Sequence, residues 1–545
     1  MKPRISIIPI LYCFILLFGS CQSDENEDGL ALFNADSLKA HIKVLASDEF
    51  QGRRPFTEGE VKTVAYMEES FKKLGLKPGN GNSYLQEVPL VEITANADPK
   101  MQIEAKTGTL ELNKTEDFVV NTQRTDSIIS LEKEELVFAG YGIVAPEYNW
   151  NDYADLDVKG KVVLVLVNDP GFATGDSMLF KGKTMTYYGR WTYKYEEAAR
   201  QGAKACLIIH NTAAASYPFS VVQSSWGSSN LFLDTRGSET YHCALQGWVS
   251  ADATKKLFDA AEIDMANIEK ASKPGFKAIP MDLQLSLNVA VTAKYDVSKN
   301  IIAQIPGTTR PDEYIIYVAH WDHLGVGKPD AKGDSIYNGA IDNASGTAAL
   351  IEMARVFKTQ KEQPERTIVF LSVTAEEQGL LGSDYYAQNP IFPLEKTVAV
   401  LNMDVVSQLE KSNDINISGA GQNDLEDYVS EVAKTQGRYI APETSPEAGH
   451  YFRSDHFSFA KVGVPALNSA GGTDIKDKGK AYGQKQFESY NENQYHRQAD
   501  NYDATWKFEG GIQDMQMLYL IGNKLAHEVT WPGWKEGSEF KALRK

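Results

Sequence analysis

The pattern of hydrophobic and polar positions changes twice along the chain. The stretch from residue 35 to about 125 begins with apolar residues at helical spacing, in DSLKAHIKVLAS. Between about 126 and 292, short apolar runs alternate with clusters of Gly, Asn and Asp, which predicts a mainly β module with one or two helices. From about 293 onward, apolar runs alternate with amphipathic helical segments. This alternation of strand-like and helical segments predicts an α/β fold.

Four near-continuous apolar runs mark the strands of the α/β part. They read NIIAQIPG, YIIYVAH, TIVFLSV and TVAVLNMD. Runs that are apolar at almost every position are typical of strands buried on both faces. We therefore expect a three-layer α/β/α domain with a mixed, largely parallel central sheet.

Three of these runs lead directly into acidic residues or histidine. Open α/β sheets bind ligands at the carboxyl ends of their strands, so side chains placed there are expected to converge. A Gly/Ser-rich helix start, GAIDNASG, and a polar loop, QYHRQAD, contribute two more candidates. The candidate residues are His320, Asp322, Glu376, Glu377, Asp404, Asp342 and His496.

Each candidate has an ordinary structural interpretation when it is taken alone. An Asp at a strand end is usually a helix cap or a turn former. Their joint occurrence favours a metal site, because imidazole together with carboxylate suits Zn²⁺. Two zinc ions can activate water and polarise a carbonyl group together. The adjacent acids Glu376 and Glu377 are expected to divide two roles, one as a ligand and the other as a general base.

The ordered set AHWDHLG, GAIDNASG, AEEQG, NMD and YHRQAD resembles the co-catalytic di-zinc aminopeptidases, secreted zinc exopeptidases of the aminopeptidase Y and bacterial leucyl aminopeptidase kind. The likeness extends from about residue 35 to 530. It implies two Zn²⁺ per chain and the release of N-terminal residues from peptides by a metal-bridged hydroxide. VFAGYGIVAPEYNW and KYEEAARQGAKACLIIH resemble the protease-associated domain found inside many members.

The resemblance implies a role for each metal-site candidate. Asp342 bridges the two ions. His320 and Asp404 complete one zinc site, and Glu377 with His496 completes the other. The segment NMDVVS replaces a more usual NxDM but leaves Asp404 intact.

The resemblance also implies catalytic roles. Glu376 is the general base, and Asp322 orients the ligand His320. Tyr495 is a candidate hydrogen-bond donor to the oxyanion. If the strand stays extended beyond His320, alternation turns His323 to the opposite face, so we expect it not to be a ligand.

Two further segments have a substrate-binding interpretation and a structural one. RSDHF contains Arg453, which is expected to line the substrate cleft. The aromatic-rich stretch Met185 to Glu197 is expected to pack between the insert and the catalytic domain rather than to cover the cleft. Cys206 is expected to be a small core hydrophobe, and nothing requires a bond to Cys243.

The N-terminus has the features of an export signal. Lys2 and Arg4 precede an apolar run from Ile5 to Gly19, and FGSC resembles a lipobox whose Cys21 is acylated. We expect a cell-envelope lipoprotein attached to the membrane through a lipid anchor only. The expected divisions are a signal peptide (1–20), an acidic tether (21–34), the N-terminal part of the peptidase domain (35–125), the protease-associated insert (126–292), the catalytic zinc peptidase domain (293–530) and a tail (531–545).

Charge narrows the possible partners. The net charge of −18, from 73 acidic and 55 basic residues, argues against nucleic acid as a partner. The resemblance to di-zinc aminopeptidases implies peptides as the substrates. Three alternatives stay open: a carboxypeptidase or dipeptidase of the same fold, a glutaminyl cyclase, and a non-catalytic peptide-binding surface lipoprotein. The first needs several cations around a substrate carboxylate, for which the sequence offers Arg453 and, more weakly, Arg190.

Overall fold

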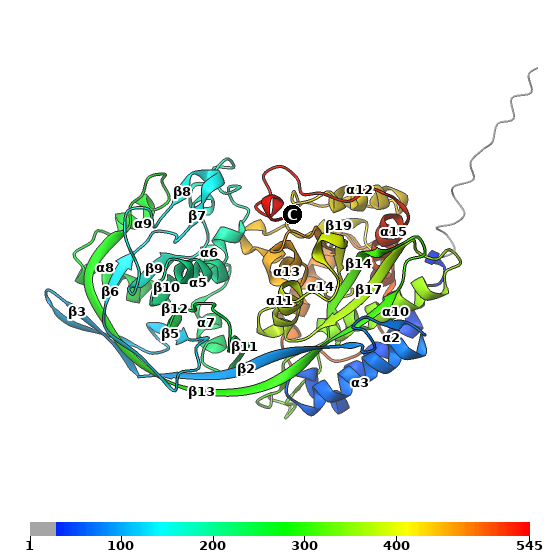
Figure 1. The fold of residues 1–545 in the computed structure, drawn as a ribbon, viewed down its shortest axis with the longest axis horizontal. Helices are drawn as coiled ribbons and strands as arrows, with labels where there is room; N and C mark the ends of the chain where they lie inside the picture. The colour runs from blue at the N-terminus through cyan, green and yellow to red at the C-terminus, as the bar shows by residue number, and fades with distance from the viewer. Residues whose placement is uncertain (1–28, 545) are drawn as a thin grey trace, which may run out of the picture.

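The computed structural model describes residues 29–544, so the expected signal peptide and Cys21 lie outside it. The chain folds into two lobes joined by two long antiparallel strands, β2 (Leu85–Ala97) and β13 (Ile279–Ile305) (Figure 1). These strands pair continuously from Leu85↔Ile301 to Ala97↔Val289. One ladder of backbone hydrogen bonds therefore extends through both lobes.

The terminal lobe contains the chain before β2 and after β13, and its central sheet has four parallel strands. In spatial order they are β17 (Arg366–Val373), β14 (Arg310–His320), β18 (Thr397–Asn402) and β21 (Ala466–Gly471). An antiparallel strand flanks each side, β13 next to β17 and β19 (Asp414–Ile417) next to β21. The mixed, largely parallel sheet that the apolar runs predict is confirmed.

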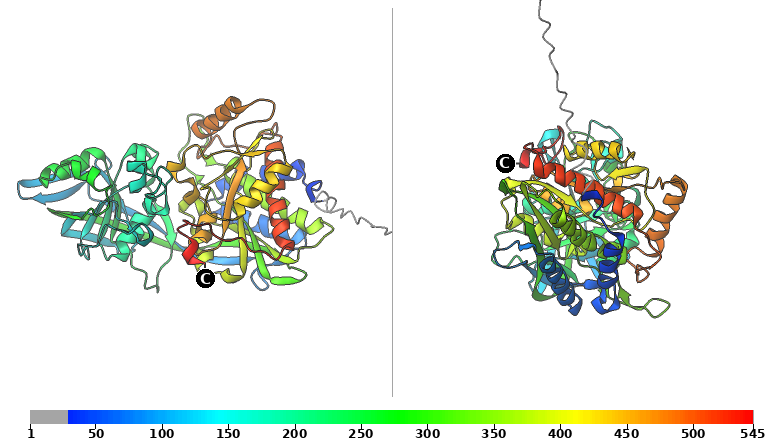
Figure 2. Two further views of the ribbon diagram at one scale, coloured as in Figure 1. Left: turned by 90° about the horizontal axis from the view of Figure 1, so that it is seen from above. Right: turned by 90° about the vertical axis from the view of Figure 1, so that its right-hand side faces the viewer.

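Helices cover both faces of this sheet (Figures 1 and 2). Alternate side chains of β14 point to opposite faces, so Tyr317 packs in one core and Val318 in another. The Tyr317 side is covered by α2 (Ala35–Leu45), α3 (Glu58–Lys73), α10 (Gly346–Thr359), α12 (Leu425–Thr435) and α15 (Glu509–His527). The Val318 side is covered by α11 (Leu381–Gln388) and α13 (His456–Ala460). The three-layer α/β/α prediction is confirmed.

The inner lobe is built on strands from the middle of the chain. They are β3 (Lys100–Ala105), β4 (Gly108–Asn113), β5 (Phe118–Asn121), β6 (Ile128–Phe138), β9 (Val162–Leu166), β10 (Ala205–Ile209), β11 (Asn230–Leu233) and β12 (Leu245–Val249). Its helices are α4 (Pro170–Thr174), α5 (Trp191–Arg200), α6 (Thr212–Ala215), α7 (Phe219–Ser225), α8 (Ala251–Ala260) and α9 (Ala266–Lys270), where one or two were expected. Cys206 and Cys243 are buried there as free thiols.

The core of the inner lobe begins earlier in the sequence than residue 126. Val91, Ile103 and Phe118 pack in it together with residues as late as Val291. The division into a peptidase domain and a protease-associated insert stays a prediction. Within residues 29–544, no helix is both long enough and apolar enough to cross a bilayer.

Candidate metal centre

The structure brings the predicted metal-site residues to one edge of the terminal lobe. His320 is the last residue of β14, and Glu376 and Asp404 lie just beyond the ends of β17 and β18. Asp342 lies in the turn that precedes α10. His496 follows the exposed helix α14 (Lys480–Asn493). Parallel strands end at the same edge, so residues far apart in the sequence meet there.

Asp342 lies between two histidines. Its Oδ1 is 3.5 Å from Nε2 of His320, and its Oδ2 is 3.2 Å from Nε2 of His496. Two ligands of one tetrahedral zinc ion, each about 2.1 Å from the metal, lie roughly 3.4 Å apart. Each oxygen of Asp342 thus has the spacing of a co-ligand with a different histidine.

The other expected ligands show similar spacings. Oδ1 of Asp404 lies 3.4 Å from Nε2 of His320, and Oε2 of Glu377 lies 3.1 Å from Nε2 of His496. Glu376 is farther away, with its Oε2 at 3.8 Å from Nε2 of His320. The atoms therefore separate into a His320 side and a His496 side, with Asp342 between them.

His323 contacts the centre directly, which differs from the expectation that it turns away. The strand ends at His320, so strict alternation does not continue to His323. Its Nδ1 lies 2.6 Å from Oε1 of Glu377. That distance is a hydrogen bond, shorter than the separation of two ligands on one ion. Although His323 forms a compact group with Asp342 and Glu377, its position is that of a support for Glu377.

The composition of the centre is suited to hold a cation. Four carboxylates meet there with three imidazoles, and among residues 29–544 no Lys or Arg forms an ion pair with any of the four. Like charges at such separations repel strongly when they are buried. A nitrogen and oxygen donor set without thiolate fits zinc. The four carboxylates are those of Asp342, Glu376, Glu377 and Asp404.

The pKa values reflect this crowding of charge. Burial, together with the nearby carboxylate of Asp404, raises the pKa of Glu376 well above its usual value. Burial disfavours the charged form of Glu377 as well, but the imidazoles of His496 and His323 outweigh it and lower the pKa of Glu377. The two adjacent glutamates therefore have opposite environments, as expected for a base and a ligand.

Asp322 supports two residues of the centre. Its backbone oxygen lies 3.2 Å from Nδ1 of His320, and its carboxylate Oδ1 accepts a hydrogen bond of 3.0 Å from the backbone N–H of Glu376. The carboxylate itself is 3.7 Å from Nδ1 of His320. Asp322 therefore fixes the backbone of Glu376, the expected base, and its carboxylate also lies next to the imidazole ring of His320.

A buried arginine that the sequence analysis missed ties two of these loops together. Arg53 is fully buried, and its guanidinium donates to the backbone oxygens of Trp321 at 2.9 Å and Gly339 at 2.9 Å. It also donates to those of Leu45 and Asn338. Trp321 follows His320 and Gly339 precedes Asp342, so Arg53 links the loops that carry two of the ligands. No local signal in QGRRPF indicates this role.

Other supporting contacts are also long-range. Ser454 Oγ donates to Oδ2 of Asp404, and the carboxylate of Asp500 accepts from the backbone N–H groups of Ile341 and Asp342. Gly339 permits a tight turn with φ of +54°, and a Cβ there would lie 2.5 Å from Cδ2 of His323. These contacts hold the ligands in place through residues that are not ligands themselves.

Each of the two expected substrate-contacting residues is the sequence neighbour of a residue of the centre. Tyr495 stacks on His496 with ring centroids 3.9 Å apart, and 43% of the surface of Tyr495 is accessible to solvent. Arg453 directly precedes Ser454 and forms no ion pair among the described residues. Tyr187, from the stretch expected to pack against the catalytic domain, lies 5.0 Å from the ring of Phe457. For this residue the packing prediction is confirmed.

Sequence comparisons with known proteins find similarity in the part of the chain that carries the candidate centre. The sequence pattern of peptidase family M28 matches residues 300–519. The chain is 34% identical over 140 residues to Aminopeptidase NAALADL1 of Mus musculus, an alignment that covers 24% of this chain and 17% of that protein. It is 39% identical over 106 residues to a probable zinc metalloprotease of Pyrenophora tritici-repentis, covering 19% of this chain and 24% of that protein.

Solved structures align with the chain over most of its length. An aminopeptidase from Aneurinibacillus sp. strain AM-1 has a TM-score of 0.49 at 19% identity, covering 94% of this chain and 97% of that one. A zinc aminopeptidase from Bacillus subtilis has a TM-score of 0.44 at 18% identity, covering 93% and 97%. The two curated relatives above are matched over only 17% and 24% of their own lengths.

Proposed function

We propose that this protein, whose residues 300–519 belong to peptidase family M28, a family of co-catalytic zinc exopeptidases, is an aminopeptidase. The observation that carries the proposal is the position of Asp342, with one carboxylate oxygen near His320 and the other near His496. A carboxylate between two groups of donors is suited to hold two zinc ions. The expected ligands are His320, Asp342, Glu377, Asp404 and His496.

In this proposal, two zinc ions supply Lewis acidity, which lowers the pKa of water and polarises the scissile carbonyl. Glu376 takes a proton from the attacking water and delivers it to the leaving amine. Asp322 fixes the backbone of Glu376, so the base stays aimed at the centre. Tyr495, stacked on His496, is the proposed donor to the oxyanion. The surplus of carboxylates at the centre suits a substrate with a free, positively charged amine.

The test compares peptides that differ only at the N-terminus. A free-amine peptide is expected to lose its first residue, whereas its N-acetylated form is expected to be stable. Metal analysis of the active protein is expected to give two zinc ions per chain. Equal cleavage of both peptides would favour the carboxypeptidase alternative. One metal ion per chain without peptide cleavage would favour a glutaminyl cyclase.

We further propose, from the sequence features described above, that the protein is exported and held at the cell envelope by acylation of Cys21. Metabolic labelling with a fatty-acid analogue tests this, with Cys21→Ser as the control that should lose both label and membrane association. The inner lobe is the proposed protease-associated domain.

A further inference from the structure

The loop that carries the expected base contacts the inner lobe. Glu376 and Glu377 lie in a single 3₁₀ turn between β17 and α11, and Gln378 is the last residue of that turn. The side-chain Oε1 of Gln378 accepts a hydrogen bond of 3.1 Å from the backbone N–H of Leu231. Leu231 belongs to β11, a strand of the inner lobe. The two lobes therefore meet directly next to the expected ligand Glu377.

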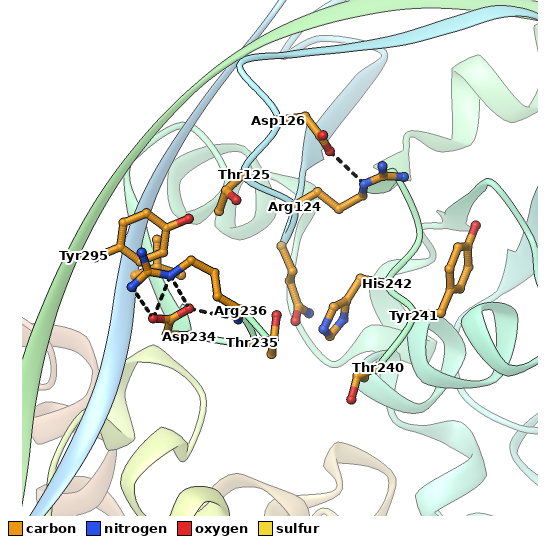
Figure 3. Close-up of a pocket in the computed structure, with 12 residues that line it drawn as sticks. Arg124, Thr125, Asp126, Asp234, Thr235, Arg236, Thr240, Tyr241, His242 and Tyr295 are labelled. Carbon is orange, nitrogen blue, oxygen red and sulfur yellow. Dashed lines mark hydrogen bonds and ion pairs between the residues drawn. The ribbon is translucent and has the colours of Figure 1, made fainter. Parts of the chain in front are cut away.

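Strand β11 is anchored to the two long strands that join the lobes. It pairs antiparallel with β2, which in turn pairs with β13. Just after β11, Asp234 forms an ion pair of 2.6 Å with Arg236, whose guanidinium lies 3.5 Å from the ring centroid of Tyr295 on β13 (Figure 3). The backbone N–H that reaches Gln378 therefore comes from a strand with a fixed position.

An apolar cluster joins the same strand to the other end of the loop. Leu231 and Ala375 are both fully buried, and they pack together with Leu90 of β2 and Leu381 of α11. Ala375 directly precedes Glu376 in the sequence. The inner lobe therefore contacts the loop on both sides of the expected base, through an apolar side chain before it and an amide after it.

The backbone conformation of this loop depends on outside support. Ala375 has a φ of +52° and Leu380 has a φ of +63°, a region that residues with a side chain rarely adopt. Such conformations persist where the surrounding structure fixes them. The terminal lobe fixes one point, because the Asp322 carboxylate accepts a hydrogen bond from the backbone N–H of Glu376. The inner lobe fixes a second point through Gln378.

We propose that Gln378 is a positioning residue, through which β11 of the inner lobe holds Glu376 in its working position at the metal centre. This inference rests on the proposed peptidase function and gives the inner lobe a part in catalysis without contact to the substrate. An amide suits this role, because it accepts a hydrogen bond without adding negative charge beside four carboxylates. A displacement of about 1 Å at a reacting group can lower a rate by roughly a hundredfold.

Kinetics of Gln378 variants test the proposal. Gln378→Met has a similar length but no amide oxygen, so kcat is expected to fall by roughly tenfold or more, with KM within twofold and two zinc ions still bound. Gln378→Glu keeps an acceptor oxygen and should recover part of kcat. Gln388→Met, which changes an exposed glutamine of α11, is the matched control and should keep full activity. Unchanged kcat in Gln378→Met, or loss of zinc in parallel with kcat, would overturn the proposal.

Hydrogen exchange separates this inference from the proposed activity. In the zinc-loaded protein, Gln378→Met is expected to speed exchange of the Leu231 amide, which loses its acceptor, and of the Glu376 amide, whose loop is released, each by roughly tenfold or more. The amide of Ile208, on the central strand β10 of the inner lobe, should keep its rate. Faster exchange at Leu231 and Glu376 supports the positioning role even if no peptide is hydrolysed. Faster exchange at Leu231 alone, or at neither amide, would refute it.

Discussion

Nδ1 of His323 lies 2.6 Å from Oε1 of Glu377, so a histidine outside the expected ligand set supports a carboxylate inside it. Residues that hold metal ligands in this way commonly change metal affinity by about 10–100-fold when removed. His323→Ala is therefore expected to weaken zinc binding by this factor in competition with a chelator. His242→Ala, a half-buried histidine of the inner lobe, should leave zinc affinity unchanged. Unchanged affinity in His323→Ala would mean that the contact does not support the ligand.

Glu376→Gln separates proton transfer from metal binding. Loss of a general base typically costs about 10²–10⁴-fold in rate. We expect kcat to fall by that factor while metal analysis still gives two zinc ions per chain. Glu395→Gln, an exposed glutamate of the same lobe, is the control that should keep full activity. If Glu376→Gln loses metal in proportion to activity, Glu376 is a ligand rather than the base.

Arg53→Lys tests the buried link between the ligand loops. Lysine cannot replace the four hydrogen bonds that Arg53 makes to backbone oxygens, so carbonyl groups are left unsatisfied. We expect the free energy of unfolding to fall by about 1–3 kcal/mol for each carbonyl group that is left without a donor. Arg54→Lys, the half-buried neighbour paired with Glu92, should cost less than about 1 kcal/mol. Urea denaturation measures both, and equal losses would contradict a special role for Arg53.

Removal of metal should destabilise the terminal lobe. Without a cation, the carboxylates at the centre repel one another, so the melting temperature is expected to fall after chelation. Added zinc should restore it, with a gain of about 2.7 kcal/mol when free zinc is 100 times its dissociation constant. Magnesium at the same concentration is the control and should restore little, since the donor set includes imidazole. An unchanged melting temperature after complete metal removal would argue against a metal centre at this position.

The burial of Lys194 predicts that the stability of the inner lobe depends on pH. It is fully buried, its Nζ has no hydrogen-bond partner among the described residues, and burial lowers its pKa to about 7. The unfolded chain, with a pKa near 10.5, binds more protons than the native state between these values. Stability relative to Lys194→Met is therefore expected to increase from pH 7 to 9, by at most about 1.4 kcal/mol per pH unit.

Denaturation of both proteins at pH 7, 8 and 9 measures this difference. Lys159→Met, a substitution on the surface of the same lobe, serves as the control and should show a constant difference from the wild type. A difference for Lys194→Met that stays constant from pH 7 to 9 would show that the lysine is charged in the folded protein and would contradict the prediction.

The parts of the fold that could be predicted depend on local pattern. The runs YIIYVAH and TIVFLSV became β14 and β17 because strands buried on both faces leave a continuous apolar signal. The inner lobe was predicted less completely. Short helices such as α6 and α7 carry too few turns for a clear apolar period, and the contribution of Val91 to that core depends on long-range pairing of β2 with β13.

The position of the candidate site was predictable for a related reason. His320 ends a strand, and Glu376 and Asp404 follow strands. The alternation of strands and helices implies that these strands are parallel, so the three side chains converge at one edge of the sheet. The position predicted for His323 was wrong, because the alternation of side chains along β14 was assumed to continue into the loop beyond His320. Arg53 was missed, because its four acceptors come from three separate segments of the chain.

By itself, the sequence determined the α/β/α class and the donor types at the sheet edge, since both follow from the order of residues along single strands. The resemblance of its ordered motifs to di-zinc aminopeptidases added the expected role of each donor. Only the tertiary structure decided which groups support the ligands and the expected base. Leu231 and Gln378 lie 147 residues apart, and the hydrogen bond between them depends on how two lobes pack, a property that no local pattern encodes.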